Sequence, residues 1–382
     1  MWWLGLGVEL VLFGWLALEL TNSPWMVALI GFIRTTPYLF GMFTSAITDR
    51  FRRRDLLIAL QVIIISGISI LAALSWIGSL KYWHLAVVSF IHGSCWTLDW
   101  PTRRALYPDL VGKERIIDAM VLDNILLNIA RCLGPLIGGI LMRYSGASGA
   151  FLLNGFLLGL ALLFVSLLQT TSRAPSSPSG LRDAYHRLME GLHYVRRRPR
   201  IRGVLFITLF MNMWIFPFLT LVPVFVRDVL DRGPLSLGVM TSSFGLGAII
   251  GIFVVRWCRR YWSDALIFAA GSLVCAAGAA SFSFSGIFEI SLVFIIIAGI
   301  GLAGFSIMQS GIILSDSSSE MRGRSMAAAV LAIGGSPLGG LQSIGLVIVF
   351  GAPITVAAMS LLGFAAIAGV AMYLPGFLGS DR

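Results

Sequence analysis

The chain has 382 residues, of which 57% are hydrophobic and 12% are charged, and its formal net charge is +10. Soluble domains carry about 25% charged residues. The composition therefore excludes an ordinary soluble protein and indicates one that crosses a membrane many times. The basic residues lie in short segments between apolar runs, where they set topology, so we expect no nucleic-acid partner.

Apolar runs long enough to span a bilayer, about 20 residues each, occur in two groups of six. The first group covers approximately 1–21, 25–48, 55–77, 82–106, 116–142 and 149–170, and the second 201–226, 235–256, 262–283, 288–312, 325–349 and 353–377. We predict an all-α integral membrane protein with twelve transmembrane helices in two six-helix bundles. The bundles would comprise residues 1–170 and 201–382, with a linker over 171–200.

The first apolar run only just reaches the length that a span requires. It has no basic region before it and no cleavage site of small residues, so we interpret it as a retained helix rather than a signal peptide. Two interpretations stay open for its start, which begins directly with Trp2. Either the first helix is complete, or the chain is truncated or has a misassigned start.

Basic residues fall mainly on one side of the predicted topology. With both termini in the cytoplasm, the outer connections contain only Lys81, Arg143, Arg227 and Arg232, and the inner ones contain the arginine clusters. This asymmetry supports the twelve-helix count. In the linker, apolar residues recur at helical spacing from Leu181 to Val195, which predicts an amphipathic helix on the inner membrane surface. A helix that binds a soluble partner is the alternative.

The second apolar run ends in a dense basic cluster. Gly41 and Ser45 precede Asp49 at helical spacing, and Arg50 and Arg53 follow it. This pattern resembles the loop between helices two and three of the major facilitator superfamily, which usually has Gly at the position of Ser45. A plain stop-transfer sequence is the alternative.

Three further stretches resemble the same superfamily. Residues 101–109 fit a Pro-x-Arg-x4-Pro-Asp pattern that ends at Asp109, and residues 107–139 resemble the fourth loop and fifth helix of the bacterial exporter branch, typified by the enterobactin exporter. Gly134 and Pro135 resemble the start of its helix-five antiporter motif, although Ala130 replaces the leading Gly. Residues 320–324, which include Arg322 and Arg324, resemble the corresponding loop of the second half. The resemblance implies a secondary transporter that works by alternating access.

Charged residues inside predicted spans are candidate functional groups, because they are costly in a bilayer and usually face a partner or a wet cavity. They are Glu9, Arg34, Asp99, Asp123 and Arg131. The resemblance implies that helices one, two, four and five face a central cavity. We expect Glu9 to exchange protons, with Arg131, or else Arg34, as its electrostatic partner. A static pair that fixes helix packing is the alternative.

Helix four offers a second set of polar candidates on one side: His92, Trp96, Asp99 and Arg103. A relay from His92 to a carboxylate is one interpretation, and a histidine that donates to a nearby carbonyl is the other. Asp99 is the rival carboxylate for coupling, unless it is committed to Arg103.

The second half has no acid or base deep in its predicted spans. Its candidates are neutral or aromatic and would form a wall suited to an amphipathic substrate: Asn212, Trp214, Phe218 and Gln309. Packing in the core or against lipid is the alternative for each aromatic residue. At the cytoplasmic face we expect a latch of Asp49, Arg50 and Arg53 with Arg103, Arg104, Asp316 or Glu320.

These features predict proton-coupled export of a small amphipathic compound, such as a drug, a siderophore-like molecule or a metabolite. We expect a monomer in the inner membrane of a bacterium, with protons or another cation as the coupling ion and no cofactor. The four cysteines lie in apolar runs without C-x-x-C spacing, which indicates neither a metal site nor a disulfide framework. The alternatives are a lysophospholipid flippase or importer of the same fold, or an inactive or truncated membrane scaffold. An enzyme is disfavoured, because no nucleophile–base pair or phosphate loop occurs outside the spans.

Overall fold

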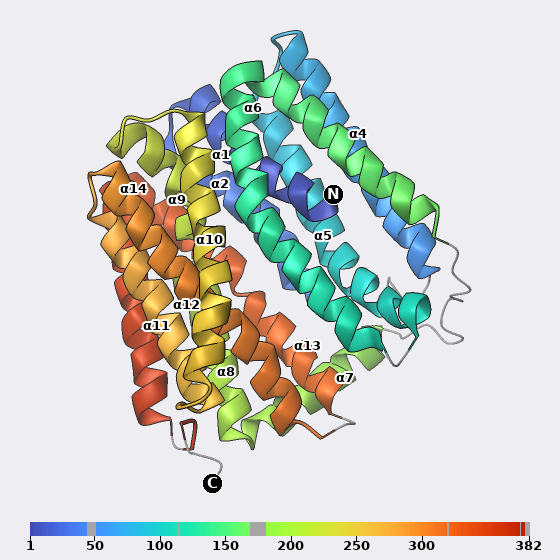
Figure 1. Cartoon of the computed structure of the whole chain (residues 1–382), viewed down its shortest axis with the longest axis vertical. Coiled ribbons are helices and arrows are strands. Elements are labelled where there is room, and N and C mark those ends of the chain that lie inside the picture. Colours follow the sequence, from blue (N-terminus) through green and yellow to red (C-terminus); the bar gives the residue numbers. More distant parts are fainter. Residues whose placement is uncertain (44–50, 113–114, 169–180, 319–320, 375, 379–382) are drawn as a thin grey trace.

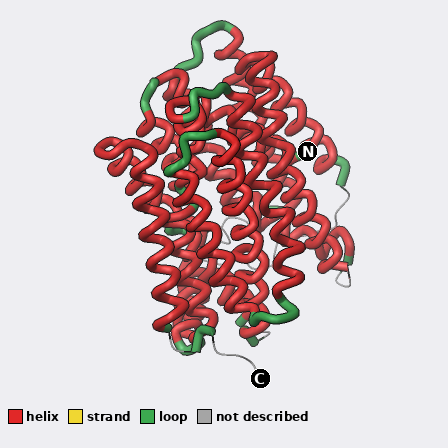
Figure 2. The backbone as a smooth tube through the Cα atoms, turned by 60° about the vertical axis from the view of Figure 1, so that its left-hand side comes forward, coloured by secondary structure: helices red, strands yellow, loops and turns green. Residues whose placement is uncertain are grey.

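The computed structural model describes residues 1–43, 51–112, 115–168, 181–318, 321–374 and 376–378, which contain helices and no strand. The first half consists of α1 (Trp2–Thr21), α2 (Pro24–Thr35), the 3-10 helix η1 (Thr36–Phe43), α4 (Arg53–Trp76), α5 (Tyr82–Val111) and α6 (Ile116–Ser166). The helices run along the long axis of the molecule (Figure 1, Figure 2).

The second half begins with α7 (Leu181–Arg196), followed by one interrupted span made of α8 (Pro199–Phe210), η3 (Met211–Ile215), α9 (Phe218–Val224) and η4 (Phe225–Val229). The segments η3 and η4 are π-helical. The remaining helices are α10 (Pro234–Cys258), α11 (Asp264–Ser283), α12 (Phe288–Asp316), α13 (Arg322–Ile333) and α14 (Ser336–Tyr373).

Eight helical stretches of the described residues are long and apolar enough to cross a membrane. Two of them change direction at a glycine with positive φ, Gly146 (φ 65°) in α6 and Gly351 (φ 75°) in α14, a conformation that glycine adopts without steric cost. Figure 1 shows α6 folding back on itself at the upper end. When these two stretches are divided, and α2 with η1 and α5 are added, the helices are consistent with the predicted twelve spans.

Glycines bring the helices of the two halves into backbone contact. A Cβ on Gly139 of α6 would lie 2.9 Å from the Cα of Gly238 in α10, and a Cβ on Gly340 of α14 would lie 3.2 Å from the Cα of Phe32 in α2. Small residues allow such close approach between membrane helices. The halves therefore meet along two seams, α6 with α10 and α2 with α14.

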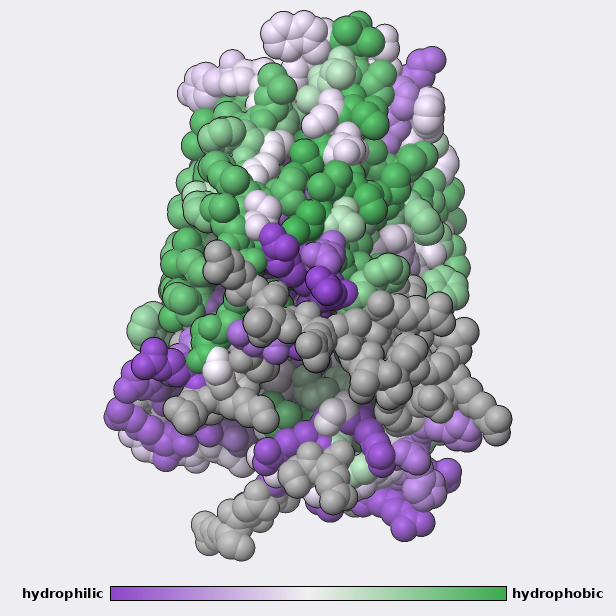
Figure 3. All heavy atoms as spheres, turned by 90° about the vertical axis from the view of Figure 1, so that its right-hand side faces the viewer, coloured by the Kyte–Doolittle hydropathy of each residue, from purple (hydrophilic) through white to green (hydrophobic). Residues whose placement is uncertain are grey.

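The surface is apolar over most of its height and hydrophilic mainly at one end, as expected of a membrane protein. Apolar side chains cover the upper and middle parts of the face in Figure 3, and hydrophilic side chains gather mainly at the lower end. The N-terminus lies at mid-height (Figure 1). The upper and lower ends are named below as they appear in Figure 1.

The helix predicted in the linker is α7, and it docks onto the lower end of the second half. Arg324 of α13 contacts Glu190 at 2.9 Å. The backbone N–H of Ser318 donates to the Tyr194 hydroxyl oxygen at 3.1 Å. This hydrogen bond is the main reason that the pKa of Tyr194 lies below its ordinary value. Arg198, just beyond α7, donates to the carbonyl oxygen of Asp316 at 2.9 Å.

Candidate functional site

Three polar residues from three helices meet in the interior of the first half. Glu9 of α1 is fully buried, and its Oε2 lies 2.6 Å from Nδ1 of His92 in α5 and 3.4 Å from Nη2 of Arg34 in α2. Among the described residues, Glu9 Oε1 and His92 Nε2 have no hydrogen-bond partner. We call these three residues the charged triad.

The charged triad lies near the middle of the apolar belt. Arg34 and His92 are each ten residues from the upper start of their helices, which is about 15 Å at 1.5 Å per residue. Glu9 is twelve residues from the upper end of α1, or about 18 Å. Half the thickness of a bilayer core is about 15 Å, so a buried carboxylate at this depth requires a cation beside it, which Arg34 supplies.

The structure brings together Glu9 and Arg34 but not Glu9 and Arg131, which sequence reasoning favoured. Arg131 of α6 is exposed, and among the described residues it has neither an ion pair nor a hydrogen bond with another side chain. The distance between two helices depends on the tertiary structure and cannot be read from the spacing of residues along the chain. The sequence suggested that His92 takes part in a relay to a carboxylate, and in the structure Glu9 is the carboxylate beside it.

Asp99 is committed to Arg103 one helical turn away. Its two oxygens accept hydrogen bonds from Arg103 at 2.9 and 3.1 Å, and its side chain is 1% exposed. The guanidinium of Arg103 also lies 5.1 Å from the ring of Trp2. Asp123 of α6 is half-buried and accepts a hydrogen bond from the indole of Trp3 at 3.0 Å. These contacts fasten the start of α1 to α5 and α6.

An aromatic column runs beside the charged triad, and sequence reasoning identified only one of its members. Trp96 packs 4.9 Å from Tyr38 of η1 and 6.0 Å from Trp100, measured between ring centroids. The guanidinium of Arg104 lies 4.0 Å from the ring of Trp100. The spacing of four residues from Trp96 through Trp100 to Arg104 was the available signal, since residues four apart share a helix face.

Neutral hydrogen bonds take the place of charges in the interior of the second half. Asn212 of η3 accepts a hydrogen bond from Ser336 at 2.9 Å, and Gln309 of α12 donates to Thr208 at 2.7 Å. The indole of Trp214 donates to Gln342 of α14 at 3.0 Å. These contacts, which we call the neutral network, link α8 and η3 to α12 and α14.

Phe218 differs from the other predicted wall residues. Its side chain is 3% exposed and packs edge-on against Phe244 of α10, with a centroid distance of 5.9 Å, and beside Phe282 of α11. In this conformation it belongs to the core of the second half and lines no exposed surface.

The residues of the predicted cytoplasmic latch are only partly described. Arg53 donates to Asp109 at 2.7 Å and to the carbonyl oxygen of Ala105 at 2.9 Å, so two of the motif residues meet at the lower end of α4 and α5. Ser45, Asp49, Arg50 and Glu320 lie outside the described residues. A Cβ on Gly41 would lie 3.5 Å from Val330 of α13 and 3.6 Å from Thr97 of α5.

The remaining motif residues have structural partners. Arg322 donates to the carbonyl oxygen of Leu314 at 3.2 Å, and Arg324 holds Glu190. Gly134 packs on α1, where a Cβ would lie 2.8 Å from the Cα of Gly7, and the adjacent Pro135 is buried. The predicted partners of the latch make other contacts, since Arg103 holds Asp99 and Asp316 faces Arg200 at 4.0 Å.

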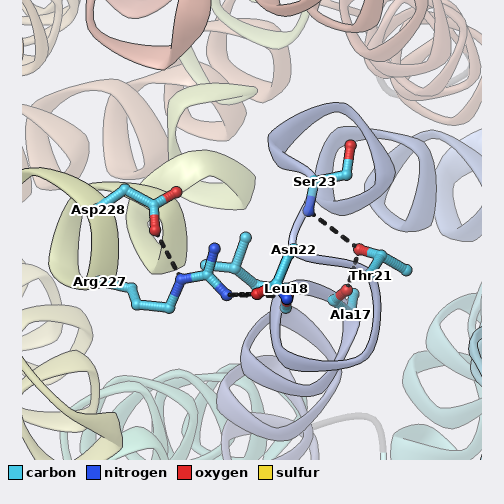
Figure 4. A network of polar contacts seen from close by, with 7 residues as sticks. All are labelled: Ala17, Leu18, Thr21, Asn22, Ser23, Arg227 and Asp228. Carbon is cyan, nitrogen blue, oxygen red and sulfur yellow. Dashed lines mark hydrogen bonds and ion pairs between the residues drawn. The ribbon is translucent and has the colours of Figure 1, made fainter.

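At the upper end, an arginine joins the two halves. Arg227 of η4 donates to the carbonyl oxygen of Leu18 and to the side chain of Asn22, both at 3.0 Å, and contacts Asp228 at 2.6 Å (Figure 4). Asn22 has a left-handed conformation (φ 49°), which ends α1, and its backbone N–H donates to the same carbonyl oxygen of Leu18 that accepts from Arg227. We call the contact of Arg227 with Leu18 and Asn22 the upper clasp.

A many-helix membrane fold with interior charges at mid-depth and two halves joined along helix seams defines a secondary transporter. The chain belongs to the transmembrane secretion effector family of the major facilitator superfamily, because the model of that family matches residues 3–380. The recognition based on the sequence motifs is therefore confirmed, and the family is one of transporters and not of enzymes.

Relatives of this chain are transport proteins, and several are named as efflux proteins. The chain is similar to macrolide efflux protein A of Streptococcus pyogenes, with 22% identity over 76% of this chain and 71% of the relative. It is also similar to the staphyloferrin A transporter of Staphylococcus aureus, at 22% identity over 65% and 62% of the two chains. The multidrug efflux pump Tap of Mycolicibacterium fortuitum is 23% identical over 68% and 65%.

Solved structures confirm the fold. A POT family transporter in complex with 5-aminolevulinic acid superposes with a TM-score of 0.77 at 14% identity, covering 99% of this chain and 96% of the other. A bacterial homologue of the lysosomal transporter Spinster gives a TM-score of 0.73 at 12% identity, covering 100% and 98%. The predicted major facilitator fold is therefore correct.

Proposed function

We propose that this protein exports small amphipathic compounds across the inner membrane of a bacterium, driven by protons that bind at Glu9. The observation that carries the proposal is the charged triad: a fully buried carboxylate at mid-depth, one oxygen of which touches His92 and Arg34 while the other is unpaired. Chains of carboxylates and histidines in membrane interiors serve as proton relays.

Alternating access explains how proton binding can be coupled to the transport of a substrate. If the halves rock and α2 follows α14, against which it packs across the seam, Arg34 would move relative to Glu9 of α1. A carboxylate favours its charged form when a cation is close and its protonated form when the cation moves away. Glu9 would therefore bind a proton in one state and release it in the other. The names of the relatives, which concern macrolides, a siderophore and several drugs, support export as the direction.

The test combines a susceptibility panel with transport in vesicles. Expression of the chain in a pump-deficient bacterium should raise resistance to at least one compound of a panel that includes erythromycin and ethidium. For that compound, everted vesicles should show uptake driven by a proton gradient. Glu9→Gln should still bind the compound but lose gradient-driven accumulation and most of its pH dependence.

Two matched variants serve as controls. Glu289→Gln removes an exposed carboxylate at the start of α12 and should leave transport unchanged. Asp99→Asn removes the rival carboxylate, which is held by Arg103, and should retain gradient dependence. If Asp99→Asn loses it while Glu9→Gln keeps it, the coupling site lies at Asp99. A wild-type chain that transports no compound would favour a membrane scaffold, and transport of labelled lysolipid alone would favour a flippase.

We further propose that the lower end faces the cytoplasm, because the basic residues gather there, so that α1 runs from the cytoplasmic side of the membrane towards the outside. In a background without the four native cysteines, a cysteine at Gly233, in the connection before α10, should react with a membrane-impermeant thiol reagent added to intact cells. A cysteine at Ser177, which lies outside the described residues, should be protected until the cells are opened. The opposite labelling pattern would contradict this orientation.

A further inference from the structure

Arg131 stands apart from the other arginines in the interior of the first half. Arg34 holds Glu9 and Arg103 holds Asp99, whereas Arg131 has no acidic partner among the described residues. It lies fourteen residues below the upper end of its span, at Ser145, which corresponds to about 20 Å. A guanidinium at this depth is costly unless an anion or water compensates it.

The face of α6 that carries Arg131 can be assigned from its neighbours. Exposed apolar residues recur at intervals of three and four along one side of the helix: Leu122, Ile125, Leu126, Ile129, Leu133 and Ile140. This periodicity marks the lipid-facing side. With about 100° between successive residues, Arg131 falls on the opposite side. Its exposure is therefore to the interior of the molecule and not to lipid.

Two helix contacts enclose Arg131 from either side. Gly138, two turns above it on the same face, packs against Val8 of α1, where a Cβ would lie 3.0 Å from the carbonyl oxygen. On the other side, a Cβ on Gly245 of α10 would lie 2.6 Å from the backbone carbon of Arg131 itself. Arg131 thus lies where α6, α1 and α10 converge, directly below the packed region of the α6–α10 seam.

Below Arg131 the same face of α6 is polar but contains no acid. Asn128 and Asn124 follow at helical spacing, and Asn124 is exposed. Their amide groups donate to the backbone carbonyls of Asn124 and Met120, at 2.9 and 2.8 Å. These neutral side chains do not neutralise the guanidinium. Asp123, on a neighbouring face, is engaged by Trp3.

We propose that Arg131 is the anion subsite of the transport site, and that the exported compounds include amphipathic molecules with a carboxylate. This inference rests on the proposed export function, because it takes the transported compound as the ligand. The planar guanidinium of arginine matches a carboxylate through two parallel hydrogen bonds. An exposed guanidinium without a counter-ion among the described residues is suited to an anion that arrives and leaves in each transport cycle.

Binding to the purified full-length protein tests this without any ion gradient. The protein in nanodiscs of zwitterionic lipid, in a low-salt buffer without carboxylate or chloride ions, is titrated with dansylglycine or dansyl-labelled undecanoic acid, and with the primary amide of each. Energy transfer from the protein's tryptophans reports binding. Wild-type protein should bind at least one carboxylate about tenfold more tightly than its amide, because hydrogen bonds between charged groups are worth more than 1.4 kcal/mol, a factor of ten.

Substitutions of Arg131 test whether this residue causes the preference for the carboxylate over its amide. Arg131→Gln should bind the carboxylate and the amide equally, with the affinity for the amide unchanged, which shows that the variant is folded. Arg131→Lys keeps the charge but not the two-pronged geometry and should retain part of the preference. Arg143→Gln removes an exposed arginine at the upper end of α6 and should behave as wild type.

Three outcomes would overturn the proposal: equal binding of acid and amide by wild-type protein, binding of neither acid, or an unchanged preference in Arg131→Gln. Competition by chloride alone, with no discrimination between acid and amide, would assign the site to an inorganic anion. These results are independent of coupling. A protein that binds carboxylates through Arg131 but transports nothing would contradict the export function and leave the anion subsite in place.

Discussion

The two halves of the molecule are built from similar helices but differ in what they bury. The first half encloses the charged triad and the Asp99–Arg103 pair, whereas the described contacts of the neutral network in the second half are made by amides, hydroxyls and an indole. Charges respond to a proton or to a membrane potential, and neutral hydrogen bonds do not. Among the described residues, the charged groups of the interior therefore lie in the first half, which is where the proposed proton coupling would take place, while the neutral network of the second half keeps a constant charge.

The largest expected effect lies in the charged triad. Arg34→Ala would leave Glu9 buried without its guanidinium, and removing one partner of a buried ion pair costs about 3 kcal/mol or more of unfolding free energy. Unfolding in mixed micelles would measure this loss. Because Glu9→Gln removes the buried charge, the double variant Glu9→Gln with Arg34→Ala should recover most of the stability. An equal loss in the single and double variants would mean that Arg34 acts through packing alone.

A truncation of the same kind in the neutral network should lower the free energy of unfolding by a smaller amount. Asn212→Ala removes the acceptor for Ser336, and loss of such a buried hydrogen bond costs about 1 to 2 kcal/mol. A double-mutant cycle with Ser336→Ala isolates the pair. The proton dependence of transport should be unchanged in both variants. If Asn212→Ala alters the pH profile as strongly as Glu9→Gln does, the contrast between the halves does not hold.

The upper clasp tests how the halves are held together. Arg227→Ala removes two hydrogen bonds to the end of α1. We expect the free energy that holds the two halves together at the upper end to fall by about 1 kcal/mol. A cysteine at Leu18, whose side chain is fully buried beside the clasp, should then react faster with an impermeant thiol reagent. Arg232→Ala, which removes a nearby arginine that lies over Phe288, serves as the control and should leave the rate unchanged.

The smallest effect is expected at the lower end, where α7 meets α13. The Glu190–Arg324 pair is largely solvated, and exposed ion pairs contribute about 0.5 kcal/mol or less. Glu190→Gln should therefore change the melting temperature by no more than a degree or two in low salt and not at all in high salt. A large loss of stability would indicate that α7 is a structural part of the second half.

The amino-acid sequence predicted the helical spans well, because apolar length and the distribution of arginines act along the chain. It also predicted which interior residues carry charge, and it predicted the Asp99–Arg103 pair, since a spacing of four residues places both on one face. The contact of His92 with Glu9 and the choice of Arg34 over Arg131 depend on the distances between helices. No periodicity within a single helix contains those distances.

Aromatic residues were the least predictable part of the site. Phe218 and Trp214 occur within four residues of each other, yet Phe218 packs between Phe244 and Phe282 while Trp214 reaches Gln342. The π-helical turn of η3 lies at this point and shifts the faces of the following residues. A regular helix projected from the sequence assigns those faces incorrectly beyond the turn.

The two π-helical turns also affect how this span tolerates changes of length in evolution. A π-turn holds one more residue than an α-helical turn at the same position, so it is the place where a single-residue insertion or deletion is absorbed locally. Loss of one residue within 225–229 would restore a regular helix but rotate Arg227 by about 100°, away from Leu18. Descendants of this sequence with a one-residue gap there should therefore carry a compensating residue opposite the end of α1.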